Sequence, residues 1–335
     1  MKKTKILPNI FISVGVFFAL TRPLAADTFI TFDVPGSTGT DCVSINPAGT
    51  ILGIYVDDSF VDHGFVRGVD GTITTCDPAG STSTDVAAIN QMGTITGSYT
   101  DSSFAGHGFV RARDGTTTTF DAPGAVNGTG PTAISIMGTI TGFYTDANFT
   151  SHGFVRALNG TLTTFDPPDS VFTTPVGINP AGTITGIYID ATFTAHGFVR
   201  ALNGTITAFD PPEAVFQTFP AGINPAGVIT GSYADASFTI HGFVRAANGT
   251  FTTFDPAGSV FTSPTAINPT GTITGGYVDS TSNFHGFVRA LNGTITTFDV
   301  PGFTSTFPNA INPAGIITGG ASSDINGAQG FIRIP

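Results

Sequence analysis

The stretch from Val176 to Pro211, VGINPAGTITGIYIDATFTAHGFVRALNGTITAFDP, decides the fold. Four short segments in it have the β-branched and aromatic composition of strands, and they lie at 176–179, 183–189, 196–200 and 205–209. Tight turns separate them. The turn Asn179–Gly182 combines a proline that presets φ with a glycine that accepts positive φ, and Asn203-Gly204 is a strong hairpin signal. We therefore expect four antiparallel strands, called first to fourth below.

The same pattern recurs along the chain with a period of about 44 residues. The string His-Gly-Phe-Val-Arg opens the third strand of six repeats, and Gln329 opens a weaker seventh copy. A Phe-Asp pair closes the fourth strand of most repeats, and Cys76-Asp77 stands in the remaining place. Four strands in a repeat of this length are typical of one blade of a β-propeller.

The repeats predict an all-β fold, a seven-bladed β-propeller of four-stranded antiparallel blades, with residues 27–335 as one domain. The segment Thr28–Asp33 is an extra fourth strand, and the last repeat ends after its third strand. Together they complete the last blade and close the ring, which protects the edges of the sheets. An open β-solenoid is the alternative, and it would not require the strand count to balance.

The first 26 residues predict a signal peptide. Met1–Lys5 is basic, Ile10–Leu20 is mostly apolar, and small residues precede a cleavage point after Ala26. The apolar run is short for a membrane span, so an uncleaved anchor is the less favoured alternative. We expect a periplasmic or extracellular protein with no membrane span after signal removal.

The motifs Gly-Phe-Val-Arg, Thr-Phe-Asp and Ile-Asn-Pro-Ala-Gly resemble those of the bacterial extracellular HAF-repeat proteins. The His-Ala-Phe string that names this family reads His-Gly-Phe here, as at His196–Phe198. The resemblance covers essentially all of the chain after residue 26. It implies an exported repeat protein, and it transfers no catalytic residue.

The charge of the chain argues against nucleic acid as a partner. The chain has 12 basic and 23 acidic residues and a net charge of −11. Binding to a phosphate backbone needs clustered lysine and arginine. After residue 26 there is no lysine, and the arginines are dispersed. We expect a monomer whose partner is a protein or a glycan.

Two sets of polar residues recur where the loop between the second and third strands is expected, at the end of the blades that we call the loop face. Propellers commonly bind ligands through such loops. The histidines that open the third strand are His63, His107, His152, His196, His241 and His285. The aspartates that close the second strand are Asp57, Asp101, Asp146, Asp190, Asp235 and Asp279. Such aspartates fit a calcium site, and histidine with aspartate fits a transition metal or a proton transfer.

A structural role for both sets is the favoured interpretation, because a residue present in nearly every repeat usually serves the repeat. Aspartate beside a turn caps backbone N–H groups, and histidine bridges loops through both ring nitrogens. The chain contains no recognised catalytic string, and Glu213 is its only glutamate. We therefore expect a non-catalytic binding propeller that requires no cofactor. A metal-assisted lyase or hydrolase using the loop-face histidines and aspartates is the alternative.

Phenylalanines also recur in these loops, at Phe60, Phe104, Phe149, Phe193 and Phe238. Exposed, they would form an apolar recognition surface. The interpretation we favour from sequence is that they pack over the ends of the blades as plugs.

The two cysteines, Cys42 and Cys76, belong to the first repeat. Cys42 is expected just before the first strand, and Cys76 in the fourth. Across four strands the separation is about 14 Å, beyond the reach of a disulfide, so a Cys42–Cys76 bond is disfavoured. The arginines that close the third strands are expected to pair with carboxylates or carbonyls between blades. Arg113 is an additional arginine peculiar to the second repeat.

Overall fold

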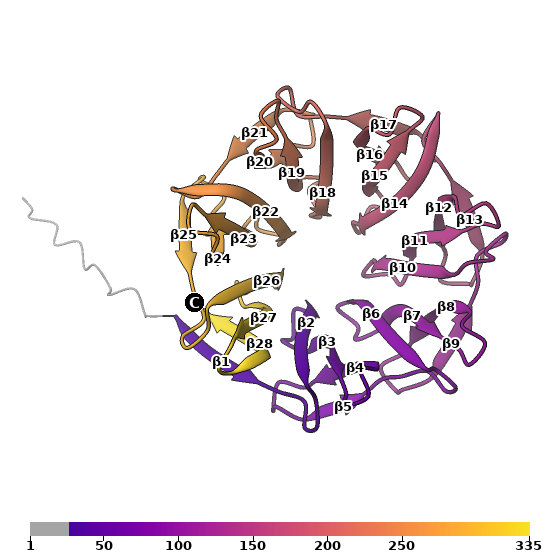
Figure 1. Ribbon diagram of the computed structural model, residues 1–335. Helices are drawn as coiled ribbons and strands as arrows, with labels where there is room; N and C mark the ends of the chain where they lie inside the picture. The colour runs from indigo at the N-terminus through magenta and orange to yellow at the C-terminus, as the bar shows by residue number, and fades with distance from the viewer. Residues whose placement is uncertain (1–26) are drawn as a thin grey trace, which may run out of the picture.

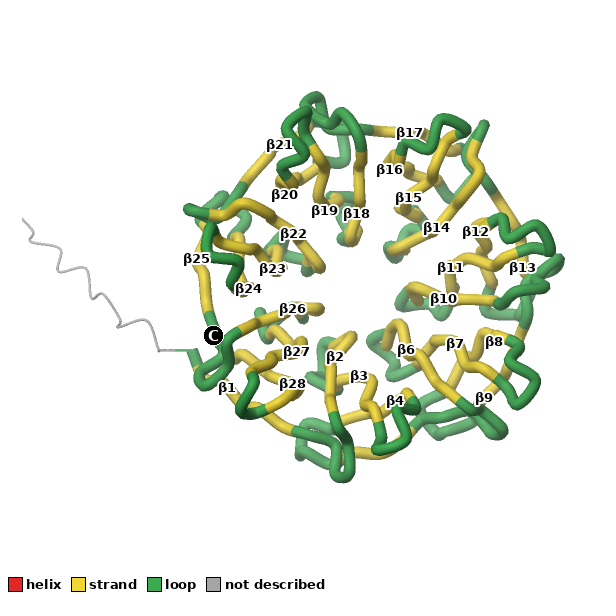
Figure 2. The backbone as a smooth tube through the Cα atoms, viewed as in Figure 1, coloured by secondary structure: helices red, strands yellow, loops and turns green. Residues whose placement is uncertain are grey.

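The computed structural model describes residues 27–335 and contains 28 β-strands and no helix in that range. The predicted signal peptide lies outside the described residues. Figure 1 shows the strands gathered in groups around a central axis, a β-propeller-like arrangement. Figure 2 shows that loops and turns connect successive strands within each group and from one group to the next. Nothing in residues 27–335 forms a helix long and apolar enough to cross a membrane.

The repeat that contains Val176 shows how each group is built. Its strands are β14 (Ser170–Ile178), β15 (Ile184–Asp190), β16 (Ala195–Arg200) and β17 (Ile206–Phe209). They pair antiparallel in chain order, β14 with β15, β15 with β16 and β16 with β17. Each repeat is thus a meander in which every hairpin joins neighbouring strands.

The other strands take the same places in their own repeats. The first strands are β2 (Gly39–Ile45), β6 (Ser83–Ile89), β10 (Thr129–Ile134), β18 (Gln217–Ile223), β22 (Ser259–Ile267) and β26 (Ser305–Ile311). The second strands are β3 (Ile51–Val56), β7 (Ile95–Thr100), β11 (Ile140–Thr145), β19 (Ile229–Ala234), β23 (Ile273–Asp279) and β27 (Ile317–Ser323). The third strands are β4 (Asp62–Arg67), β8 (Gly106–Arg111), β12 (Ser151–Arg156), β20 (Ile240–Arg245), β24 (Phe284–Arg289) and β28 (Gly327–Ile334). The remaining strands are β1 (Thr28–Phe32), β5 (Ile73–Thr75), β9 (Thr117–Phe120), β13 (Leu162–Phe165), β21 (Phe251–Phe254) and β25 (Ile295–Phe298).

The two ends of the described chain lie side by side. Strand β1 pairs antiparallel with β28, from Thr28 opposite Ile334 to Phe32 opposite Gly330. Some neighbouring groups are joined by a single parallel pairing, such as Ala195 with Gln217. The strands form three separate sheets, so backbone hydrogen bonding does not run unbroken around the axis.

The first strands are longer than predicted from sequence. Strand β14 begins at Ser170 rather than Val176. Pro175 has no N–H to donate, and a shift of register between Pro175 and Gly177 accommodates it within the strand. Cys42, expected just before a first strand, lies inside β2.

The core lies between adjacent repeats. Each third strand carries a phenylalanine with no exposed surface: Phe65, Phe109, Phe154, Phe198, Phe243, Phe287 and Phe331. The ring of Phe198 meets that of Phe165, from the fourth strand of the preceding repeat, edge to face at 5.9 Å. The buried hydroxyl of Thr185 donates to the Phe198 carbonyl at 2.9 Å. Aromatic rings thus hold the repeats together, and threonine hydroxyls join strands within a repeat.

The arginines of the third strands contradict the expectation of carboxylate or carbonyl partners between repeats. Arg200 stacks on Phe165 of the preceding repeat, with Cζ 4.8 Å from the ring centroid. The same stacking occurs at Arg67, Arg156, Arg245, Arg289 and Arg333. A guanidinium gains cation–π attraction over such a ring. Arg333 additionally pairs with Asp27, at 2.7 Å between Nη2 and Oδ2.

Both cysteines are free and buried. Cys42 packs with Val34 and Phe65, whereas Cys76 belongs to a separate cluster with Val86 and Phe109. Burial raises the pKa of each thiol to about 12. Neither cysteine is therefore a reactive thiolate at neutral pH.

Candidate functional site

Each loop-face histidine lies between two carboxylates of its own repeat. Nδ1 of His196 is 2.7 Å from Oδ2 of Asp210, and Nε2 is 3.4 Å from Oδ2 of Asp190. The imidazole also stacks on Tyr188, with ring centroids 5.1 Å apart. The same pair of carboxylate contacts occurs at His63, His107, His152, His241 and His285. The structure therefore keeps these histidines within separate repeats and does not bring them together.

The aspartates that were candidate metal ligands each serve their own turn. Oδ1 of Asp190 accepts the backbone N–H groups of Thr192 at 2.8 Å and Thr194 at 3.0 Å. The same capping occurs at Asp57, Asp101, Asp146, Asp235 and Asp279. Among residues 27–335, no group of three or more His, Cys, Asp or Glu side chains is placed to hold a metal ion. This geometry matches the structural role that the repeat suggested.

Folding shifts the pKa values of these histidines and aspartates in opposite directions. Burial, the largest effect on His196, lowers its pKa, but hydrogen bonds and charges from Asp210 and Asp190 outweigh it and raise the pKa above 6.5. The pKa is also raised at His63, His107, His241 and His285. The Thr194 N–H is the main cause that lowers the pKa of Asp190 to about 2. The two carboxylates therefore favour the protonated form of these five histidines.

We expect thermal stability to fall as the pH rises from the unfolded histidine pKa near 6.5 through the raised folded pKa. A histidine whose pKa is raised by folding stabilises the folded chain fully below its unfolded pKa near 6.5, and this contribution is lost as the pH passes the folded pKa. Gln329 holds the equivalent place in the last repeat and donates to Asp33 at 2.8 Å. Glutamine at positions 63, 107, 196, 241 and 285 should therefore flatten the profile of melting temperature against pH.

The measurement is the melting temperature of both proteins across this pH range. Burial raises the pKa of Asp41 to about 6, and this carboxyl is present in both proteins, so it cancels in the comparison. Equal slopes for the two proteins would contradict a stabilising role for the protonated histidines.

The loop phenylalanines are exposed, so the interpretation as plugs was wrong. Phe193 is 84% exposed and has a φ of 63°. Its N–H donates to the Asp190 carbonyl at 3.0 Å, which closes a four-residue turn with Phe193 in the last position. A turn this short leaves its last side chain at the tip of the hairpin. The exposed fractions of Phe60, Phe104, Phe149, Phe193 and Phe238 range from 72% to 89%, and all five have positive φ.

The other two hairpins of each repeat give an internal comparison. Gly182 and Gly204 close turns with the same hydrogen bond, at 3.0 and 2.9 Å, and have φ of 77° and 91°. Glycine occupies this last position in these hairpins because a side chain there costs about 1–2 kcal/mol. Only the hairpins between second and third strands carry phenylalanine in it. Comparing turn positions within the repeat would have revealed this in the sequence.

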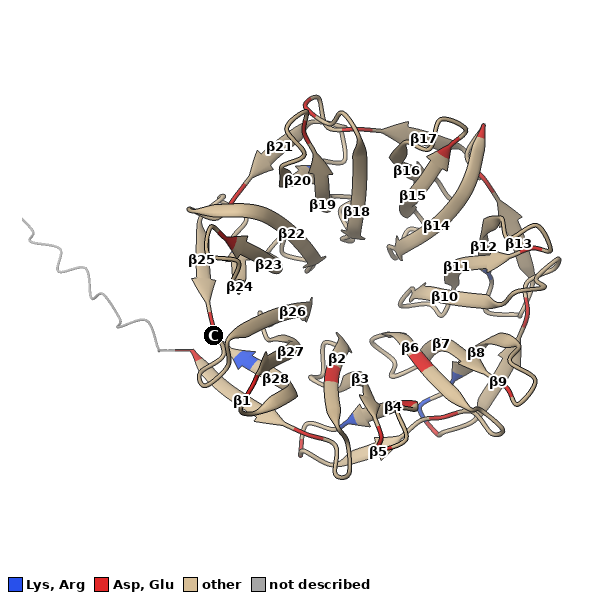
Figure 3. Ribbon diagram, in the orientation of Figure 1, with Lys and Arg blue, Asp and Glu red and all other residues tan. Residues whose placement is uncertain are grey.

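The surface around these rings is acidic and partly apolar. Phe172, Phe216 and Phe261, from the segments that join repeats, are 37–38% exposed. Phe216 stacks on Phe238, with ring centroids 4.3 Å apart. Figure 3 shows acidic residues on loops around the whole molecule and few basic ones. We name the set Phe60, Phe104, Phe149, Phe193 and Phe238 the phenylalanine ring.

No protein family model and no curated protein sequence matches the chain. Among solved structures, a streptogramin B lyase is similar with a TM-score of 0.61 and 12% identity, over 91% of this chain and 97% of that one. A virginiamycin B lyase from Staphylococcus aureus has a TM-score of 0.62 and 12% identity, over 92% of this chain and all of that one. The Cps50 (Swd1) β-propeller domain of Myceliophteria thermophila has a TM-score of 0.56 and 10% identity, over 92% and 100%. These similarities show the fold alone.

Proposed function

We propose that the chain is a seven-bladed β-propeller that acts as an exported, non-catalytic binding protein. The seven repeats support the blade count, and the pairing of β1 with β28 supports closure of the ring by the N-terminal strand. The signal-like first 26 residues and the resemblance to HAF-repeat proteins support export to the periplasm or beyond.

The phenylalanine ring is the observation that carries this proposal. Each side chain combines an unfavourable backbone conformation with an exposed apolar surface, and strained residues concentrate at functional positions. Exposure alone would not single out this face. Leu158, Leu202 and Leu291 on the opposite hairpins are 73–75% exposed, but they have ordinary φ angles.

A protein partner with apolar and basic groups fits this surface best. Buried aromatic anchors supply much of the affinity of protein interfaces. The net charge of −11 would steer a basic partner towards the chain. A glycan is less suited, because carbohydrate sites lean on tryptophan and tyrosine platforms. The chain has no tryptophan, and the face of Tyr188 is covered by His196.

The alternative of a metal-assisted lyase or hydrolase draws on the histidines and on the lyases among the structural neighbours. A general base needs a ring nitrogen within reach of substrate. Both nitrogens of His196 already contact carboxylates, and each histidine stands in its own repeat. The loop-face geometry therefore favours binding over catalysis.

The test is affinity capture from the native source on two immobilised variants and the unmodified protein. One variant carries asparagine at all five positions of the phenylalanine ring. The control carries asparagine at four exposed apolar positions of the opposite hairpins, Val69, Leu158, Leu202 and Leu291. We expect the unmodified protein and the control to retain the same partner, and the ring variant to lose at least nine-tenths of it. Equal capture by both variants would rule out the ring as the binding surface.

A further inference from the structure

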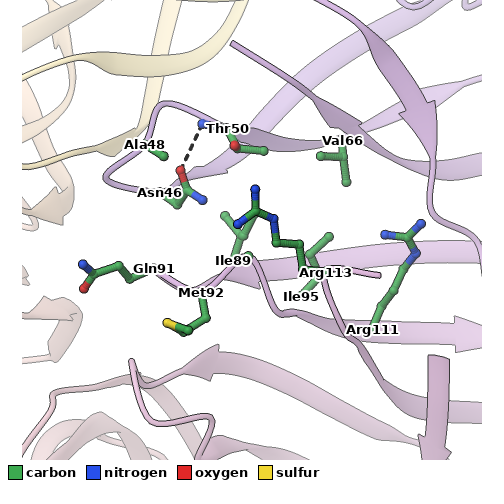
Figure 4. A pocket seen from close by; sticks show the side chains of 11 residues that line it. Asn46, Ala48, Thr50, Val66, Ile89, Gln91, Met92, Ile95, Arg111 and Arg113 are labelled. Atoms are coloured by element: carbon green, nitrogen blue, oxygen red, sulfur yellow. Dashed lines mark hydrogen bonds between the residues drawn. The ribbon is translucent and has the colours of Figure 1, made fainter. Parts of the chain in front are cut away.

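Departures from the repeat converge on one pocket at the end of the molecule opposite the loop face. The pocket has a volume of about 240 Å³ and lies between the first and second repeats. Its lining includes Gln91, Met92 and Arg113. Proline stands at the place of Gln91 in five repeats, and leucine, alanine, valine or proline stands at the place of Arg113. Figure 4 shows these side chains around the pocket together with Arg111.

A fourth departure removes the ring on which the counterparts of Arg111 stack. In the other six repeats the arginine that closes the third strand lies over a phenylalanine of the preceding repeat, 4.7–4.9 Å from the ring centroid. Cys76 replaces that phenylalanine beneath Arg111. The smaller buried thiol offers no ring on which Arg111 could stack, and Arg111 lines the pocket.

The two guanidinium groups have no carboxylate partner. Neither Arg111 nor Arg113 makes an ion pair within 4.0 Å in the part of the chain that the structure describes. Asp114 is the acidic residue nearest to Arg111 in sequence, and its Oδ1 accepts the Thr116 N–H at 2.9 Å in its own turn. Arg111 and Arg113 thus bring two cations to the lining of one pocket in a chain of net charge −11.

Asn46 adds a further donor. Its Oδ1 accepts the Thr50 N–H at 3.0 Å, and its amide nitrogen faces the pocket (Figure 4). The equivalent Asn90, Asn179 and Asn268 donate this nitrogen to a carbonyl of the next repeat. Asn46 makes no such bond within the described residues.

We propose that this pocket binds a small organic carboxylate. Arg111 and Arg113 would hold the carboxylate through charged hydrogen bonds, with the Asn46 amide as a third donor. Val66, Ile89 and Ile95 form an aliphatic wall for the apolar part of the ligand. The volume is below that of pockets for drug-sized ligands, which fits a molecule of roughly ten heavy atoms. This site is separate from the phenylalanine ring and does not depend on the proposed function.

The test is calorimetric titration of residues 27–335 with sodium hexanoate, with hexanamide as its uncharged counterpart and with inorganic phosphate. We expect hexanoate to bind at least tenfold more tightly than hexanamide or phosphate. Arg113→Leu and Cys76→Phe should each weaken hexanoate binding at least tenfold. The first removes one cation, and the second supplies a ring on which Arg111 can stack, as its counterparts do. Both substitutions install the residue found in other repeats, so both variants are expected to fold.

Leu202→Arg is the matched control for charge. It places an arginine at the equivalent position of the fourth repeat, where Arg200 remains stacked on Phe165. No additional hexanoate site is expected there. Unchanged hexanoate affinity in Arg113→Leu and Cys76→Phe, or equal affinity for hexanamide, would overturn the site, and tighter binding of phosphate would overturn the carboxylate assignment. The asparagine variant of the phenylalanine ring should bind hexanoate normally.

Discussion

Gly275→Ala is expected to lower the free energy of unfolding by about 3 kcal/mol, whereas Gly276→Ala beside it should raise that free energy by about 0.5 kcal/mol. A Cβ at Gly275 would overlap the Ser263 carbonyl oxygen and would lie 2.6 Å from the Pro264 Cα and 3.0 Å from the Phe287 ring. Backbone on one side and a fully buried ring on the other leave no room to adjust. A Cβ at Gly276 meets only the His285 carbonyl oxygen, at an ordinary 3.6 Å.

Urea denaturation of the two variants and the unmodified protein gives the comparison. Gly276→Ala controls for the loss of backbone freedom in the unfolded chain, because both substitutions reduce it equally. Similar midpoints for the two variants would contradict the packing of strand β23 against β22 and β24. The same overlap with a backbone oxygen of the first strand occurs in every repeat, at Gly53, Gly97, Gly142, Gly186, Gly231 and Gly319.

Local sequence patterns predicted the strands well. The predicted ends of a strand were wrong where pairing with a neighbouring strand, rather than local sequence, decides where it begins. The third and fourth strands of the Val176 repeat were placed within one residue, because turn residues mark their ends. Strand β14 was predicted too short, because Pro175 is a breaker by local rules. The register shift that tolerates it depends on pairing with β15.

The sequence predicted the role of the polar residues of the candidate site, but it did not predict the exposure of the apolar ones. The capping role of Asp190 follows from its place beside a turn, so it was foreseeable. The exposure of Phe193 was not expected, because composition favours burial of phenylalanine. The pocket at Arg111 and Arg113 was not foreseen, because the partner that Arg111 lacks is a phenylalanine of the preceding repeat, about 35 residues away in sequence, where Cys76 stands.

Asparagine at all five positions of the phenylalanine ring is expected to raise the melting temperature by roughly 5 °C. Asparagine adopts the left-handed conformation more readily than an aromatic residue. Each replacement should therefore stabilise the chain by about 0.5–1 kcal/mol, and the gains should add because the five turns belong to separate repeats. Phe238 should contribute least, since its replacement also removes the stacking on Phe216.

The four-position asparagine variant of Val69, Leu158, Leu202 and Leu291 separates relief of strain from removal of exposed apolar surface. Those side chains are also exposed, but their φ angles are not positive, so no gain in melting temperature is expected. An equal rise in both variants would mean that the φ of the phenylalanines carries no cost, and the strain argument for a binding surface would fail. A rise confined to the ring variant, together with loss of the captured partner, would mean that the chain sacrifices stability at these five turns in order to present aromatic side chains to that partner.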